Sequence, residues 1–509
     1  MTSPPRRWIG LLVVVLIVEA IYVYVVSASK IWDWPGYMGY YDLLAEGFRA
    51  GHLYLQVQPA PELLASANPY DPALASYWMG DVSIYGGHYF FYWGPLPALL
   101  LAAVKVLFRI SQPVGDQHLV FCFLSLMAVS GALLLEKMSR RLSAPAPFYL
   151  LAAGVLSFAL GGPALHLLAS SSVYQAALTG AQAFLMLGVM FAADVVFEAE
   201  ARPPRTWRMA AAGTAWVMAM ACRMSVTPAV GLLVLATAAA VARRHTPAAG
   251  GQRQVFGVPA ARWRQAIRVL VWTGIPLTAG FLALLIYNKA RFDRWFDFGL
   301  GRQLTTWKFT FTLRYYAANL YSYLFRRFSW SCAFPFALVP YLPRLSGPLP
   351  PWIPFQKGYV VPEPIVGLLV AAPITWLIPA ALRGAVRALR GFAQAPGYLW
   401  YAGTFLVIGT VPLMTPLGLY LATMRYQIDV APGLLMLSNL GVWTLYGQAR
   451  ATPRARRAVG ILCASLATAT VVIGLLLGYQ GYTGHFQRFN PELSSALERH
   501  LSFCPGASH

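Results

Sequence analysis

Long apolar runs recur along the chain, separated by short basic connections and by two long polar stretches. An apolar helix of about 20 residues crosses the roughly 30 Å hydrocarbon core of a membrane, and inside that core a helix satisfies its own backbone hydrogen bonds. We therefore expect an all-α polytopic membrane protein with about 11 transmembrane helices. The expected spans are 8–28, 116–136, 146–162, 173–195, 208–222, 226–242, 266–287, 365–382, 399–415, 427–446 and 458–478.

The basic connections orient these spans, because Lys and Arg collect on the cytoplasmic side of a membrane. They give one topology, with a cytoplasmic N-terminus and an extracytoplasmic C-terminus, in the cell inner (plasma) membrane. In that topology the segment 95–110, which is short and opens with two prolines, does not cross and lies at the outer interface. Val26–Ala28 imitate a signal-peptidase site, but the run before them is long enough to span, so we favour an uncleaved first helix.

The two polar stretches are then long extracytoplasmic loops, 29–94 and 288–364. The first is rich in carboxylates, Tyr and Trp, and the second in Arg and aromatic residues, with a possible amphipathic interfacial helix at 312–328. Loops held at one face of a membrane by many spans are where we expect the chemistry. We expect a transmembrane domain at 1–479 and a short extracytoplasmic tail at 480–509.

Composition supports the membrane class. The chain is 58% hydrophobic and 11% charged, whereas soluble domains carry about 25% charged residues. The net charge of +21 would suggest nucleic acid in a soluble protein, but cytoplasmic basic residues explain it here, so we expect no nucleic-acid partner. The five cysteines have no metal or redox spacing. We expect no structural disulfide, with Cys332 and Cys504 as the extracytoplasmic pair that could form one.

Three carboxylates of the first loop are candidates for a catalytic base. Asp33 follows the first span closely and should lie at the membrane surface. Asp42 lies four residues before Glu46 on an expected short helix, 39–50, so the two share a face. Asp81 opens the segment DVSIYGGHYFFYW, in which the Gly-Gly pair predicts a tight hairpin turn.

A fourth carboxylate of this loop, Asp71, has a different expected role. It lies in the sequence NPYDP, which is typical of a turn, and Asp side chains commonly cap turns through their own backbone. We therefore leave Asp71 out of the candidate catalytic set.

Two arginines lie where an apolar run meets the outside, Arg223 in ACRMSVTPA and Arg425 in MRYQIDVAP. A guanidinium buried there requires an anionic partner, and Arg matches phosphate oxygens bidentately. A lipid phosphate is one such partner, and for Arg425 pairing with Asp429 is the structural alternative. The expected substrate-binding set is Arg223, Arg425, Tyr426, Tyr41, Arg302 and Tyr92, in which the aromatic rings would stack on sugar faces.

These stretches resemble the GT-C superfamily of membrane glycosyltransferases, which includes protein O-mannosyltransferases and aminoarabinose transferases. The resemblance rests on an early loop acid before the Tyr-rich helix YYDLLAEGF, on the juxtamembrane segment YFFYWGPLPALLLA, on the arginine in ACRMSVTPA and on RYQIDVAP. Uncharacterised bacterial membrane proteins carry a similar series. Asp33 is followed by Trp34 and lies farther from Tyr40 than the family pattern has it, so Asp42 and Asp81 remain alternatives for the base.

The resemblance implies an inverting transfer of one sugar from a polyprenyl-phosphate donor to an acceptor hydroxyl at the extracytoplasmic face. The acceptor would be a cell-envelope glycan, lipid or protein. A first-loop Asp would act as general base, and the arginines would hold the phosphate. No cofactor is required, although a divalent metal is compatible with the site. The alternatives are a lipid-linked glycan transporter or flippase, which predicts charges in mid-span, and a non-catalytic scaffold.

Overall fold

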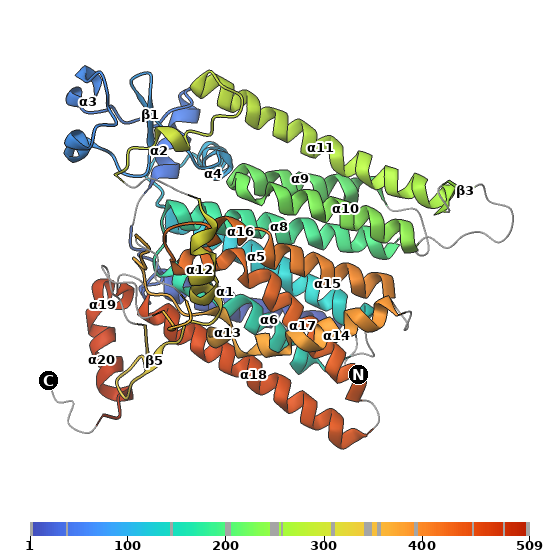
Figure 1. Cartoon of the computed structure of the whole chain (residues 1–509). Coiled ribbons are helices and arrows are strands. Elements are labelled where there is room, and N and C mark those ends of the chain that lie inside the picture. The colour runs from blue at the N-terminus through green and yellow to red at the C-terminus, as the bar shows by residue number, and fades with distance from the viewer. Residues whose placement is uncertain are drawn as a thin grey trace.

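The computed structural model describes residues 4–36, 39–142, 146–198, 205–244, 254–255, 258–306, 311–339, 349–353, 358–390, 395–449, 452–481 and 484–504. Long helices lie side by side in one bundle, and many of the short helices gather at one end of it with β1 and β5, while β3 lies at the opposite end (Figure 1). The long helices are α1 (Pro4–Val26), α5 (Asp116–Arg141), α6 (Phe148–Leu160), α8 (Val173–Glu198), α9 (Thr206–Cys222), α10 (Thr227–Arg244), α11 (Ala260–Phe292), α14 (Ile378–Leu389), α15 (Ala395–Thr410), α17 (Ala431–Gln448) and α18 (Pro453–Gln480).

Seven helices of the described chain are long and apolar enough to cross a membrane: α1, α5, α8, α10, α11, α15 and α18. The chain is therefore a multi-pass membrane protein. The expected count of 11 spans includes shorter helices, such as α6 and α9, and stays a prediction. Charged residues of the described chain lie near the ends of the candidate spans rather than in their interiors. Among the described Asp, Glu, Lys and Arg residues, Glu19 alone lies well inside a candidate span.

The expected span 365–382 is not one helix. It forms α13 (Leu368–Ala371), the 3-10 turn η5 (Pro373–Leu377) and then α14. Pro373 and Pro379 lack backbone N–H groups, and each lies in the first turn of a helical segment, where that group is not needed. The expected span 427–446 likewise opens as the 3-10 helix η6 (Met424–Asp429) and becomes α-helical at α17, where Pro432 occupies the first turn.

The short elements belong mainly to the two loops and the tail. They are α2 (Tyr40–Arg49), α3 (Pro61–Ala65), η1 (Pro72–Tyr77), β1 (Ser83–Tyr85), β2 (His88–Phe90), α4 (Leu96–Leu107), α7 (Ala164–Leu168), η2 (Met224–Val226), β3 (Gln254–Val255), β4 (Val258–Pro259), η3 (Leu300–Arg302), η4 (Leu313–Tyr315), α12 (Tyr316–Leu324), β5 (Ser329–Trp330), β6 (Ala337–Leu338), α16 (Met414–Leu417), α19 (His485–Phe489) and α20 (Pro491–Leu501). Elements of both loops and of the tail share one end of the bundle (Figure 1).

The first loop folds as its local sequence predicts. α2 is the expected short helix, and Asp42 and Glu46 on one face of it both pair with the Lys105 ammonium on α4, each at 2.6 Å. In Figure 1, α4 is viewed along its axis while the bundle helices run across the picture, as expected for a helix that does not cross. Asp71 caps η1 by accepting from the Ala73 N–H at 2.9 Å, so its expected capping role is confirmed.

The Gly-Gly pair forms the expected turn. Gly86 and Gly87 have φ values of +55° and +78°, which L side chains rarely adopt, and they join β1 to β2 with Tyr85 opposite His88. The hairpin is fixed to the second loop, because the Leu304 N–H donates to the Val82 carbonyl at 2.9 Å. The start of the hairpin therefore has a defined position beside the second loop.

The expectation of no structural disulfide is wrong. Cys332, in the β5–β6 turn of the second loop, is bonded to Cys504 just after α20. The spacing of the cysteines could not indicate this pair, because 172 residues separate them in the sequence. Disulfides persist in oxidising compartments, so the bond agrees with an extracytoplasmic position for this end of the bundle.

Loss of this bond is expected to lower stability. Replacing Cys332 with serine frees the second loop from α20, and a native disulfide typically contributes about 2–4 kcal/mol. We expect a lower unfolding temperature for Cys332→Ser and Cys504→Ser, measured by the loss of the monodisperse peak after heating. Cys122→Ser, at a free cysteine, is the control. Labelling of Cys332 by a maleimide in unreduced protein would contradict the bond.

Candidate functional site

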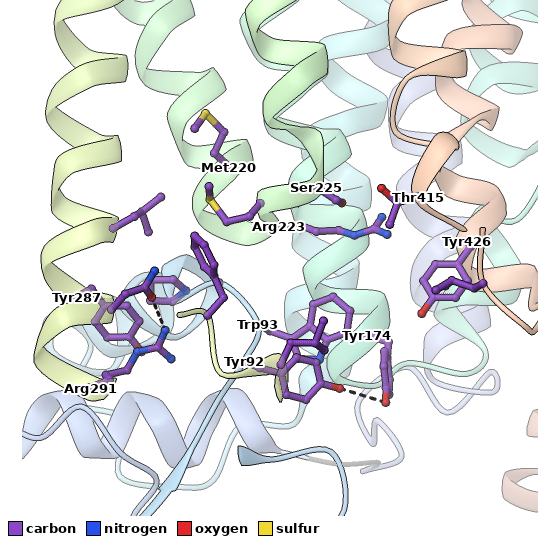
Figure 2. Close-up of a pocket in the computed structure, with 18 residues that line it drawn as sticks. Tyr92, Trp93, Tyr174, Met220, Arg223, Ser225, Tyr287, Arg291, Thr415 and Tyr426 are labelled. Atoms are coloured by element: carbon purple, nitrogen blue, oxygen red, sulfur yellow. Dashed lines mark hydrogen bonds between the residues drawn. The ribbon is translucent and has the colours of Figure 1, made fainter. Parts of the chain in front are cut away.

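Two cavities adjoin at the end of the bundle that carries elements of both loops. One, the polar cavity, has a volume of about 320 Å³. The other, the apolar cavity, has a volume of about 210 Å³ (Figure 2). Tyr174 and Tyr426 line both, so these two rings form the partition between them. The polar cavity is lined by Asp81, Tyr174, Gln303, Thr305, Val360, Pro362, Tyr420, Leu421, Arg425 and Tyr426.

Asp81 brings the first loop into the polar cavity. It lies just before β1 with φ +59°, a left-handed conformation that Asp and Asn adopt more readily than other non-glycine residues. The Tyr174 hydroxyl at the start of α8 donates a hydrogen bond to its carboxylate. Backbone conformation and hydrogen bond together aim this half-buried carboxylate into the cavity.

Arg425 lines the same cavity and is paired with Glu363 at 2.7 Å. The two segments meet because the Val360 N–H donates to the Tyr420 carbonyl at 3.0 Å and the Ala422 N–H to the Val360 carbonyl at 3.1 Å. Burial lowers the Arg425 pKa, but the charge of Glu363 together with those of Tyr426, Tyr174 and Asp81 outweighs burial and raises it above its usual value. Burial raises the Glu363 pKa, against the pull of Arg425. Arg425 therefore stays charged in the cavity.

Asp429, expected as the alternative partner of Arg425, pairs instead with Arg223. Nη1 of Arg223 lies 2.6 and 2.5 Å from the two Asp429 oxygens. Arg223 follows α9 directly, and Gly94 allows the first loop to approach that helix end, since a Cβ at Gly94 would lie 1.9 Å from the Ala221 carbonyl oxygen. The guanidinium carbons of Arg223 and Arg425 each lie 5.6 Å from the Tyr426 ring, so the two arginines flank the partition.

Hydrogen bonds accepted by tyrosine hydroxyl oxygens link the partition to both loops. Tyr92 donates to the Tyr174 oxygen at 3.3 Å, and Gln303 Nε2 donates to the Tyr92 oxygen at 3.2 Å. Burial raises the Tyr92 pKa above its usual value, so this hydroxyl remains protonated as a donor. The polar cavity is thus built from the first loop, the second loop, α8 and η6.

The remaining predicted site residues lie outside the lining of both cavities. Asp33 is exposed in the turn after α1, and Asp42 is held by Lys105. Tyr41 is fully buried with its ring 5.0 Å from that of Phe91. Arg302 pairs with Asp297 at 2.9 Å and lies over the Tyr85 ring. Their expected roles in catalysis and binding stay predictions.

Several residues of the site were not in the predicted set, among them Glu363, Tyr174, Gln303 and Arg291. Of these, Glu363 alone could have been singled out from the sequence, because it is the one acidic residue between Asp297 and Asp429. The others lie among many similar polar or aromatic residues. In the described part of the chain, no group of three or more His, Cys, Asp and Glu residues could hold a metal ion.

No protein-family model and no curated protein matches the chain. Solved structures give a distant likeness. ArnT from Cupriavidus metallidurans bound to undecaprenyl phosphate is 12% identical, with a TM-score of 0.46, over 97% of this chain and 80% of that one. The Archaeoglobus fulgidus oligosaccharyltransferase in its apo form is 11% identical, with a TM-score of 0.44, over 97% of this chain and 60% of that one.

The same archaeal enzyme, AglB, in complex with an inhibitory peptide and a dolichol-phosphate, is 12% identical with a TM-score of 0.44, over 99% of this chain and 60% of that one. This chain thus spans about 60% of the length of the archaeal enzyme. These neighbours are GT-C superfamily membrane glycosyltransferases, the group that the sequence motifs resemble. At these scores the likeness carries no conclusion about function.

Proposed function

We propose that this protein transfers a sugar from a polyprenyl-phosphate-linked donor to an acceptor hydroxyl at the extracytoplasmic face of a bacterial inner membrane. The observation that carries the proposal is that Asp81 and Arg425 line one cavity. An acid that can accept a proton and a guanidinium that can bind an anion are the two functions that such a transfer requires. The apolar cavity beside them offers room for the lipid end of the donor.

In the proposed reaction the donor phosphate lies near the partition, between Arg223 and Arg425. The acceptor oxygen attacks the anomeric carbon of the sugar from the polar cavity while its proton passes to Asp81. The bond between the anomeric carbon and the phosphate oxygen breaks, and its electron pair stays on the phosphate. Arg425 and Arg223 stabilise the charge that develops there. One displacement of this kind inverts the anomeric configuration.

The surrounding residues support these roles. Tyr174 holds the Asp81 carboxylate through a hydrogen bond, and Glu363 keeps Arg425 oriented. Arg425 and Arg223 supply the electrostatic stabilisation that a divalent metal would supply elsewhere. The rings of Tyr92, Tyr174 and Tyr420 offer stacking faces for a sugar. A cell-envelope glycan, lipid or protein would supply the acceptor hydroxyl.

The proposal is tested with the full-length protein in proteoliposomes. We expect a radiolabelled hexose to pass from a polyprenyl phosphohexose to envelope lipids or glycans added at the outer face, with inversion at the anomeric carbon. Translocation is measured in the same vesicles as the fraction of donor that becomes protected from a glycosidase added outside. Movement of the donor across the bilayer without any transfer would replace the proposed activity with transport.

A further inference from the structure

A chain of hydrogen bonds leads from the second loop to Asp81. Nε2 of Gln303 donates to the Tyr92 oxygen at 3.2 Å, and the Tyr92 hydroxyl donates to the Tyr174 oxygen at 3.3 Å (Figure 2). The Tyr174 hydroxyl in turn donates to Oδ1 of Asp81. We call Gln303, Tyr92 and Tyr174 the relay. The reaction proposed above uses only its last bond, so Gln303 and the Tyr92 hydroxyl have no part in that reaction as it stands.

The three bonds of the relay have one direction. An amide N–H donates and cannot accept, so the bond from Gln303 leaves Tyr92 free to give its own proton to Tyr174. Tyr174 is then free to give its proton to Asp81. Hydrogen bonds in such a series polarise and strengthen one another, and the effect is larger in a low-dielectric site. The relay therefore favours the ionised form of Asp81, which is the form that can accept a proton.

Gln303, the first member of the relay, is held in place by the hairpin of the first loop. It is 8% exposed and pairs with Ser83 of β1 in an antiparallel bridge. The Ser83 hydroxyl donates to the Gly299 carbonyl at 2.7 Å, which fixes the turn before Gln303. Oε1 of Gln303 is buried and has no hydrogen-bond partner among the described residues. Buried polar atoms are rarely left unpaired, and an exception is often found at a functional residue.

Other charged and titratable groups also act on Asp81. The Arg425 guanidinium, which lines the same cavity, favours the carboxylate through space. Burial raises the pKa of Tyr40 on α2 and of Tyr92 above the usual value, and the Asp81 charge adds to this, so both hydroxyls stay protonated. Arg425 and Tyr40 are unchanged in variants of the relay, and such variants therefore test the hydrogen bonds of the relay alone.

We propose that Gln303 and Tyr92 are positioning residues for Asp81, which through Tyr174 aim its carboxylate at the acceptor and return it to the ionised form after each transfer. The inference rests on the proposed function and adds to it how the base is prepared for the next turnover. During transfer the acceptor O–H bond breaks, and its proton binds the carboxylate oxygen that Tyr174 does not contact. Asp81 then gives this proton to a water molecule, which leaves as hydronium, and the relay favours that loss.

The test uses the full-length protein in proteoliposomes and the transfer assay described above. Phenylalanine keeps each tyrosine ring and removes only the hydroxyl. We expect Tyr174→Phe to lower kcat about tenfold, because hydrogen bonds to charged groups have effects of at least about this size. Tyr92→Phe and Gln303→Leu act from farther away, and each should lower kcat about threefold. Tyr77→Phe, at an exposed tyrosine of the first loop outside both cavities, should transfer as wild type.

The pH profile and a double variant separate positioning from a structural role. Removing a hydrogen-bond donor makes the ionised carboxylate less favourable, so the relay variants should lose kcat at a higher pH than wild type on acidification. We expect the acid limb of the profile to move up by about half a unit to one unit. KM for the lipid-linked sugar should not change, because the rings and arginines remain. Adding Tyr92→Phe to Tyr174→Phe should cause no further loss, since Tyr92 acts through Tyr174.

Wild-type kcat and pH profile in folded Tyr92→Phe and Gln303→Leu would overturn the inference, as would losses that multiply in the double variant. A lower kcat with an unmoved acid limb and a lower unfolding temperature would assign both residues to the fold alone. If Gln303→Leu does not fold, Tyr92→Phe and the double variant decide the matter. Failure of the proposed function has a different signature, because wild type would then transfer no sugar. Transfer that is lost in Asp81→Asn but kept in every relay variant would overturn this inference alone.

Discussion

Asp81→Asn is expected to reduce sugar transfer about 10²–10⁴-fold, the usual contribution of a general base, while leaving the protein folded. Asparagine has nearly the shape of aspartate and tolerates the left-handed backbone conformation at this position, but it cannot take the acceptor proton. Transfer from the polyprenyl phosphohexose is measured at saturating donor, together with the unfolding temperature.

Two matched variants of the same loop separate Asp81 from the other acids. Asp33→Asn and Asp71→Asn change exposed carboxylates outside both cavities, and both should transfer at the wild-type rate. Asp42→Asn should lower folded yield, because it leaves the Lys105 ammonium without one of its two partners. Wild-type transfer by Asp81→Asn, or complete loss in folded Asp33→Asn, would assign the base to another residue.

The second large effect is expected for Arg425→Met, which should lower transfer about 10²–10³-fold, the range for removing one group that stabilises charge in a transition state. We expect weaker binding of the phosphohexose donor but unchanged apparent affinity for the acceptor. Equal weakening of both substrates would indicate that Arg425 supports the fold of the cavity rather than the donor phosphate.

A double variant separates these two roles. Arg425→Met alone leaves the Glu363 carboxylate buried and unpaired, which destabilises a protein by about 3–5 kcal/mol. Adding Glu363→Gln removes that buried charge, so the double variant should regain much of the unfolding temperature. Its transfer rate should stay as low as that of the single variant. Recovery of activity together with stability would show that the loss came from misfolding.

Local features of the fold were predictable from the sequence, because short-range chemistry decides them. The bounds of α2, the cap made by Asp71 and the turn at the Gly-Gly pair follow from residues close together in the chain. The apolar runs predicted the positions of the long helices for the same reason. The expected span at 365–382 is wrong because Pro373 and Pro379 divide it into separate short helical segments.

Pairings between distant segments were not predictable in this way. Arg425 was expected near a first-loop acid and does share a cavity with Asp81, but its ion-pair partner Glu363 comes from the second loop. That pair depends on the backbone hydrogen bonds of Val360 with Tyr420 and Ala422. The pattern of apolar and polar residues in the sequence does not indicate this contact. The partner of Asp42 is likewise 63 residues away, on α4.

The bond between Cys332 and Cys504 has a consequence for how the protein is made. Cys504 follows α18, so in the topology expected from the basic connections the ribosome synthesises that helix before the second cysteine can reach the outside. Until then the Cys332 thiol of the second loop stays unpaired. We therefore expect the bond between Cys332 and Cys504 to form after translation. Thiol-oxidising enzymes that act on exported chains would catalyse this step.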